Sequence, residues 1–182
     1  MHQYPVAPEL TVSHWLNTDS PLYLSELKGK VVVIHTFQML CPGCVSYGLP
    51  QTEKLTHFFQ QEDVVVIGLH TVFEHHEAMQ LESLKAFVHE YRLSFPIAVD
   101  APSSNSIPIT MGEYQLAGTP SLVIIDKNSK IHFTHHGEID DMLVSKIVSS
   151  LVLETNSVNN DIELEATTST PKQSDRIRCS VN

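Results

Sequence analysis

The sequence predicts an α/β domain in which a central mixed β-sheet is covered by helices on both faces. Two almost uninterrupted β-branched runs, VVVIHTF at 31–37 and VVVIGL at 64–69, have the composition of strands buried on both sides. A helical pattern follows each run, and a hairpin pattern with one more helix closes the series. Strands that alternate with helices and then end in a hairpin and a helix build a mixed sheet between helical layers.

The elements between these landmarks are shorter. A helix is expected after CPGC, over residues 45–61, and Pro50 should bend it because proline lacks an amide donor. Residues 95–100 (FPIAVD) predict another strand, and the Pro- and Ser-rich stretch 101–110 predicts a loop or broken helix. A second helix is expected over 77–92, where apolar side chains recur at helical spacing: Leu81, Leu84, Val88 and Tyr91.

The C-terminal half of the domain reads as a hairpin and a helix. SLVIID at 121–126 and IHFTHH at 131–136 are joined by the turn KNSK, which predicts two antiparallel strands. Acidic Glu138, Asp140 and Asp141 suit the first turn of the last helix, where the helix dipole favours negative charge. The buried face of that helix is expected to consist of Ile139, Met142, Leu143, Ile147 and Leu151.

The chain length favours one compact domain. We assign residues 1–153 to it, with residues 1–30 as an N-terminal extension that forms a cap or hairpin. Residues 154–182 are polar, rich in Ser, Thr and Asn, and short of core-forming side chains. They are therefore expected to be a flexible C-terminal tail.

Charge and hydropathy exclude two classes of partner. The formal net charge is −10 and no basic stripe is present, so contact with nucleic acid or an anionic membrane surface has no electrostatic support. No apolar run is long enough to span a bilayer. The start, MHQYPVAPEL, lacks the basic and apolar regions of a secretory signal, which predicts a cytoplasmic location.

The number and spacing of the cysteines give the first indication of function. Three cysteines are too few for a disulfide scaffold, and Cys41 and Cys44 form a C-x-x-C pair. In a reducing compartment such a pair indicates redox or metal chemistry. Cys179 lies in the polar tail, where an inert thiol is the simplest interpretation.

Two motifs resemble one known family. VVVIHTFQMLCPGC resembles the strand and active-site turn of thioredoxin-like proteins of the TlpA/ResA branch, and AGTPSLVIIDKNSKI resembles their second signature. The resemblance covers roughly residues 5–153 and implies the thioredoxin fold, thiol–disulfide oxidoreductase activity and no cofactor. By motif, the family's cis-proline maps onto Pro120, beside the dithiol and preceded by Thr119. The implied partners are a disulfide-containing protein or small thiol as substrate, and a reductase or thiol as electron donor.

The chemistry of thiol exchange explains this pattern. A thiolate attacks a disulfide, and a cysteine at a helix N-terminus is favoured as thiolate, which makes Cys41 the expected nucleophile. Cys44, one turn on, is the expected resolving thiol. Pro42 suits a helix start and, with Gly43, tunes the thiolate. The backbone of Thr119, beside a cis-Pro120, is expected to pair with an extended substrate.

Three positions depart from the family pattern. Leu40 replaces the tryptophan common before the first cysteine, and with Met39 it is expected to form an exposed apolar docking patch. His35 stands six residues before Cys41, where thioredoxin has a buried acid, and either shuttles a proton or is a core histidine. Glu74 either approaches the dithiol or is a solvated loop carboxylate, and the second interpretation is favoured.

Other functions stay open as alternatives. A peroxiredoxin-like peroxidase would need Pro and Thr or Ser where this chain has Ile34 and Gln38. Metal binding is suggested by the C-x-x-C pair and by the histidine pairs at 75–76 and 135–136, but a second ligand pair in a known pattern is missing. A thioredoxin-fold adaptor without redox turnover is the nonenzymatic alternative.

Overall fold

A six-stranded mixed sheet forms the centre of the protein, whose computed structural model describes residues 4–104 and 106–154. The order of the strands is β1-β4-β3-β2-β5-β6. β2 and β3 pair in parallel, as do β3 and β4, and the remaining pairs are antiparallel. The strands are β1 (Val12–Leu16), β2 (Val31–Phe37), β3 (Val64–His70), β4 (Ile97–Asp100), β5 (Ser121–Ile125) and β6 (Ile131–His136). The predicted mixed sheet is thus confirmed.

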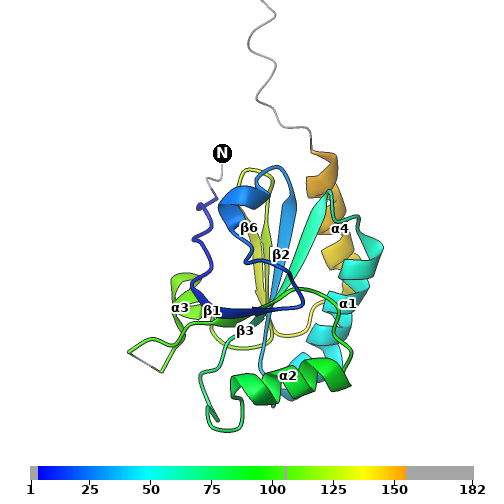
Figure 1. The fold of residues 1–182 in the computed structure, drawn as a ribbon. Coiled ribbons are helices and arrows are strands. Elements are labelled where there is room, and N and C mark those ends of the chain that lie inside the picture. Colours follow the sequence, from blue (N-terminus) through cyan, green and yellow to red (C-terminus); the bar gives the residue numbers. More distant parts are fainter. Residues whose placement is uncertain (1–3, 105, 155–182) are drawn as a thin grey trace, which may run out of the picture.

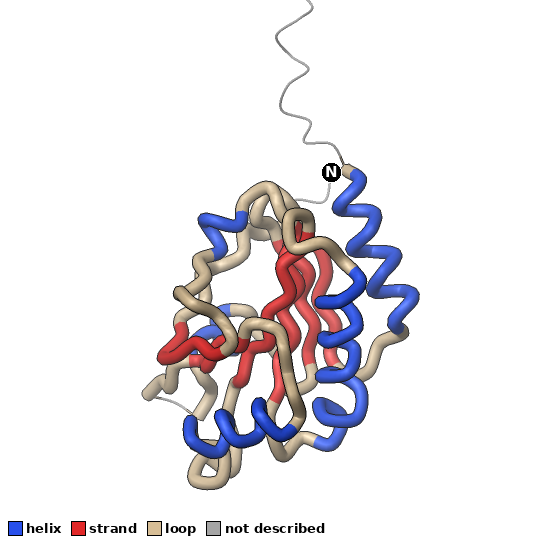
Figure 2. The backbone as a smooth tube through the Cα atoms, turned by 45° about the vertical axis from the view of Figure 1, so that its right-hand side comes forward, coloured by secondary structure: helices blue, strands red, loops and turns tan. Residues whose placement is uncertain are grey.

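Helices cover both faces of this sheet (Figure 1). α1 (Leu49–Phe58) and α4 (Asp141–Leu153) run along one side of the strands, as the turned view in Figure 2 also shows. α2 (Leu81–Glu90) packs on that face through Leu84 and Val88, which join a buried cluster containing Phe37 of β2 and Cys44. On the opposite face lie α3 (Ile109–Glu113) and a short 3₁₀ turn, Leu24–Leu27.

The strand composition explains why β2 is central. All seven of its residues are buried, and alternate side chains enter different clusters. Val31 and Val33 pack with Val144 and Val148 of α4. Val32 and Ile34 pack on the other face with side chains around α3, including Met111 and Tyr114. β2 therefore joins the two halves of the core and delivers its C-terminal end to the site described below.

The N-terminal segment corrects one expectation. Within the described part of residues 1–30, the hairpin alternative is wrong, because β1 pairs antiparallel with the remote strand β4 and forms an edge of the main sheet. Trp15 of β1 is half-buried and packs against the core. The predicted tail beyond residue 154 lies outside the described residues.

Two helix predictions also need correction. α2 begins at Leu81 rather than residue 77, since turns occupy the preceding residues, and Tyr91 at its end is exposed. α4 buries Val144, Val148 and Leu151, whereas Met142 and Leu143, expected on its buried face, are exposed. Asp140 caps α4 by accepting hydrogen bonds from the amides of Met142 and Leu143.

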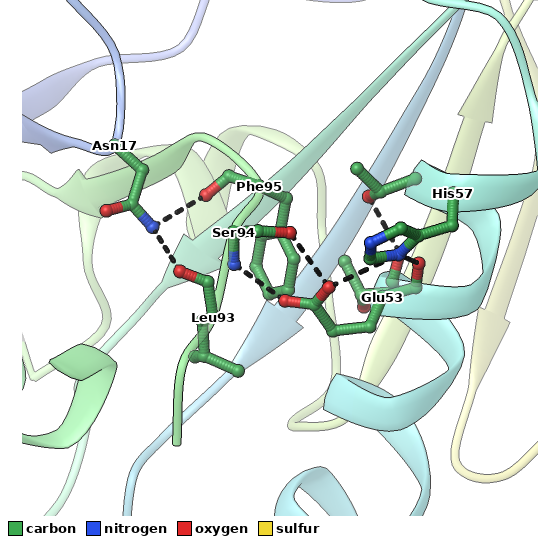
Figure 3. Close-up of polar contacts among 8 residues, drawn as sticks. Asn17, Glu53, His57, Leu93, Ser94 and Phe95 are labelled. Atoms are coloured by element: carbon green, nitrogen blue, oxygen red, sulfur yellow. Dashed lines mark hydrogen bonds and ion pairs between the residues drawn. The ribbon is translucent and has the colours of Figure 1, made fainter. Parts of the chain in front are cut away.

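Side-chain hydrogen bonds fix α1 and β1 to the connection between α2 and β4 (Figure 3). Glu53 of α1 accepts from the amide and hydroxyl of Ser94 at 2.7 and 2.9 Å. Asn17, just after β1, donates its side-chain amide to the carbonyl oxygens of Leu93 and Phe95 at 2.7 and 3.1 Å. The bonds of Glu53 thus fix α1, which continues the helical segment after the cysteines, to the α2–β4 connection.

Candidate active site

The two cysteines lie where β2 passes into a helix. β2 ends at Phe37, a turn follows, and helical backbone begins at Pro42, directly after Cys41. The helix continues through a π-helical segment, Cys44–Gly48, before α1, so the irregularity expected near Pro50 is present one turn earlier. Cys41 and Cys44 form a disulfide with their Cα atoms 5.2 Å apart. Cys41 is half-buried, whereas Cys44 is fully buried.

Backbone groups surround the sulfur of Cys41. The amide of Cys44 donates a hydrogen bond to Cys41 Sγ at 3.2 Å, and the carbonyl oxygen of Thr119 lies 3.6 Å from the same sulfur. An amide that points at sulfur at a helix N-terminus favours the thiolate form after reduction. Cys44 is buried among apolar side chains, an environment that disfavours its thiolate.

The second motif meets the first in space. The Thr119–Pro120 peptide bond is cis, and Pro120 is buried beside the start of the helix. A Cβ atom built on Gly43 would lie 3.4 Å from Cδ of Pro120, so Gly43 lies close to the proline ring. Pro42 is exposed at the helix start. The structure thus brings Cys41, Thr119 and Pro120 together.

His35 lies under the helical segment. Its side chain is buried and packs so closely on Gly48 that a Cβ there would lie 2.6 Å from its Cε1 atom. Burial lowers the pKa of His35 to about 4, and Nδ1 has no hydrogen-bond partner among the described residues. His35, Tyr47 and Pro120 help line a cleft of about 270 Å³ between the start of α1 and the β6–α4 connection. His35 is therefore a neutral buried imidazole in the wall of a cleft beside the cis-proline.

Glu74 and Leu40 occupy the rim of the site. Glu74 is exposed, and its Oε1 lies 3.5 Å from Nε2 of Gln38; among the described residues no hydrogen bond joins it to either cysteine. Leu40 is 58% exposed. Met39, however, is buried in the cluster that contains Cys44, so the predicted patch of two exposed side chains is reduced to Leu40.

Two further buried polar residues lie near the disulfide. The sequence placed His70 at a strand end near the expected active face, either as a site residue or as a packed polar residue, and it gave Gln38 no role beyond the comparison with peroxidases. Gln38 follows β2 directly, and its side chain contacts two loops. His70 ends β3, pairs in register with Phe37 and contacts its ring at a centroid distance of 5.2 Å. Within the described part of the chain, both ring nitrogens of His70 lack hydrogen-bond partners, and burial lowers its pKa to about 4. The signal for both was a polar residue at the end of an apolar strand.

The histidine pairs have local contacts of their own. His135 Nε2 lies 3.0 Å from the carbonyl oxygen of Glu138, and His136 Nδ1 lies 3.2 Å from the hydroxyl of Ser121. Within residues 4–104 and 106–154, no group of three His, Cys, Asp or Glu side chains is placed to hold a metal ion.

In the same part of the chain, no helix has the length and apolar character needed to cross a membrane.

The fold and the disulfide define a class of protein: a thioredoxin-like α/β domain with a cysteine pair at C-x-x-C spacing. The Redoxin family model matches residues 5–151, and the chain belongs to the redoxin family. The predicted relationship to the TlpA/ResA-like members is thereby confirmed.

Individual proteins support this placement. The chain is 44% identical to the solved structure of a thiol-disulfide isomerase from Corynebacterium glutamicum, with a TM-score of 0.80 over 85% of this chain and 100% of that one. It is 26% identical to the thiol-disulfide oxidoreductase ResA of Halalkalibacterium halodurans, over 69% of this chain and 64% of that protein. It is 33% identical to NHL repeat-containing protein 2 of Gallus gallus, over 72% of this chain and 18% of that protein. The chain thus spans less than two thirds of the length of both curated relatives.

Proposed function

We propose that this chain exchanges electrons with disulfide-containing proteins or small thiols through Cys41 and Cys44, with Cys41 as nucleophile and Cys44 as resolving thiol. The observation that carries the proposal is the asymmetry of the pair. Cys41 is partly accessible, and its sulfur accepts a hydrogen bond from the Cys44 amide, whereas Cys44 is fully buried. Only the accessible sulfur can meet a substrate first, and the local amide makes it the better thiolate.

The reaction balances as two exchanges. In the reduced chain, the Cys41 thiolate attacks one sulfur of the substrate disulfide, that S–S bond breaks, and the departing thiolate takes up a proton. Cys44 then loses its proton and attacks the Cys41 sulfur, which releases the second substrate thiol and leaves the Cys41–Cys44 disulfide. Two electrons have passed to the substrate, and a thiol or reductase must restore the dithiol. The same steps run in reverse oxidise a substrate.

We assign supporting roles to the neighbouring residues. The Thr119 carbonyl, 3.6 Å from Cys41 Sγ, is the proposed docking point for an extended substrate backbone, with Pro120 and Gly43 shaping the contact. His35 is the proposed relay for the Cys44 proton. The support for this role is its position, because the ring packs on Gly48 under the helical segment and lines the cleft. Burial lowers its pKa to about 4, so the ring is neutral at pH 7 and can hold a proton only in passing. Glu74 contributes a carboxylate at the rim of the site.

A cytoplasmic location stays a prediction from the sequence.

The peroxidase alternative gains no support from the site. Gln38 stands where a peroxidase needs a hydroxyl, and its side chain is already engaged with the Phe73 amide. The adaptor alternative differs from the proposal in one measurable way, since an adaptor works equally well without its cysteines.

Trapping the mixed disulfide tests the assignment of the two thiols. In a Cys179→Ser background, Cys44→Ser is expected to stop after the first exchange and to accumulate a substrate adduct on Cys41, because no buried thiol is left to resolve it. Intact mass spectrometry and peptide mapping detect the adduct, and dithiothreitol should remove it. The matched Cys41→Ser variant should accumulate none. Equal adduct formation by both variants, or by neither, would reject the proposed roles.

A further inference from the structure

Gln38 is a buried polar side chain that the proposed chemistry does not use. It lies between the end of β2 and Cys41, and only 1% of its surface is exposed. A buried amide group costs free energy unless hydrogen bonds replace those it made with water. Its partners therefore reveal what holds it in place.

Those partners come from both sides of Cys41. Oε1 of Gln38 accepts a hydrogen bond from the amide of Phe73 at 3.3 Å, and Nε2 lies 3.5 Å from Oε1 of Glu74. The same nitrogen lies 3.5 Å from Oγ1 of Thr119. The backbone carbonyl of Gln38 accepts from the Cys41 amide at 3.2 Å. One residue thus links the loop after β3, the loop before β5 and the nucleophile.

The chemistry of the side chain fits this position. A carboxamide offers one acceptor and two N–H donors, which matches one amide donor and two oxygen acceptors. An ionised glutamate of the same shape could accept from Phe73 but could not donate to Thr119 or Glu74. An apolar side chain of similar length could make none of the three contacts.

We propose that Gln38 is a positioning residue that holds Thr119 and the 73–74 segment in fixed places on two sides of Cys41, so that an extended disulfide-bearing chain docks in register with the sulfur. The inference rests on the proposed oxidoreductase function and names the substrate class that depends on Gln38. A small disulfide that touches only the sulfur needs no such register, whereas a peptide backbone paired with Thr119 does.

The test compares two probes in steady-state kinetics: an extended peptide glutathionylated on its single cysteine, and 2-hydroxyethyl disulfide. Gln38→Met is expected to raise KM for the peptide about tenfold, since small misplacements of docking groups are costly. Its kcat, and its rate constant with 2-hydroxyethyl disulfide, should stay at wild-type values. The matched control is Gln51→Met. Gln51 is also a buried glutamine, and it donates to the Ile139 carbonyl and the Asp141 carboxylate at 2.9 and 2.8 Å. That variant should lose stability and keep the wild-type KM.

Other outcomes would overturn the positioning role of Gln38 or the proposed function. An unchanged peptide KM in Gln38→Met, or an equal loss with both probes, overturns the positioning role. If Gln38→Met does not fold, Thr119→Val removes the facing hydroxyl from a half-buried position and is expected to raise the peptide KM in the same way. An unchanged KM in that variant overturns the inference as well. A wild-type chain that reduces neither probe rejects the proposed function itself.

Discussion

Acidification from neutral pH to about pH 4 is expected to lower the free energy of unfolding by several kcal/mol, chiefly because two histidines are buried in neutral form. His35 and His70 have pKa values of about 4 in the folded chain, against 6.5 when exposed, and burial is the main cause for both. Between these values the unfolded chain binds protons that the folded chain does not, so every fall in pH favours unfolding. At about 1.4 kcal/mol for each pKa unit, the limit is roughly 3 kcal/mol for each histidine.

Urea unfolding at a series of pH values measures this effect. His70→Met is expected to remove about half of the pH dependence, and His35→Met a similar share, because methionine does not titrate. His89→Gln is the matched control, since that side chain is 86% exposed and meets water in both states. Burial raises the pKa of Asp100, which opposes the trend at the acidic end, so the comparison rests on differences between variants. A His70→Met variant with the wild-type pH dependence would show that His70 is not buried in neutral form.

Gly68→Ala is expected to destabilise the chain by about 3 kcal/mol, at the upper end of the cost of overpacking a core. Gly68 lies in the middle of β3, between His35 of β2 and Ile97 of β4. A Cβ atom there would lie 2.5 Å from Cε2 of Phe95 and 3.3 Å from Cε1 of Phe37. Both rings are fully buried, so neither can move aside without displacing the core.

Thermal unfolding checks this prediction. A loss of about 3 kcal/mol should lower Tm by roughly 10 °C in a domain of this size. Gly112→Ala is the matched control, because the nearest atom to its added Cβ, Cγ2 of Ile107, lies 3.9 Å away and alanine favours the helix at that exposed position. It should melt at or slightly above the wild-type Tm. A Gly68→Ala variant that melts with the wild type would contradict the packing described for Phe95.

The sequence predicted the centre of the fold because local composition determines it. β2 and β3 are β-branched runs buried along nearly their whole length, and the β5–β6 hairpin follows from a turn between two strand patterns. α3 was not predicted, because it is short and is stabilised by a residue that lies outside the helix. The carboxylate of Asp100 accepts from the amides of Thr110 and Met111, a contact that no local pattern reveals.

Other failures have the same origin. β1 joins the sheet by pairing with β4, which is remote in sequence. The pairing of the two strands has a register shift after Val12. The sequence of α4 contains more apolar residues than one face can hold, so periodicity alone could not select Val144 and Val148 over Met142 and Leu143. Packing of the helix against β2 made that choice.

The same difference between local patterns and long-range contacts explains which residues of the candidate site could be predicted. The cysteine spacing indicated Cys41 and Cys44, and the resemblance of the second motif to the TlpA/ResA branch implied Thr119 and Pro120. The role we assign to Gln38 depends on contacts with Phe73, Glu74 and Thr119, which only the folded chain brings together. Met39 was misjudged for a related reason, because the turn that exposes Leu40 directs its neighbour into the core.

A redox titration tests the central claim, that Cys41 and Cys44 cycle between dithiol and disulfide, most directly. The chain is equilibrated in defined glutathione or dithiothreitol buffers and alkylated, and the mass shift on the two cysteines is read for each buffer. We expect one reversible two-electron transition with a midpoint of about −180 to −270 mV, the range of related dithiols. Cysteines that stay reduced in every buffer, or that oxidise irreversibly, would contradict the account.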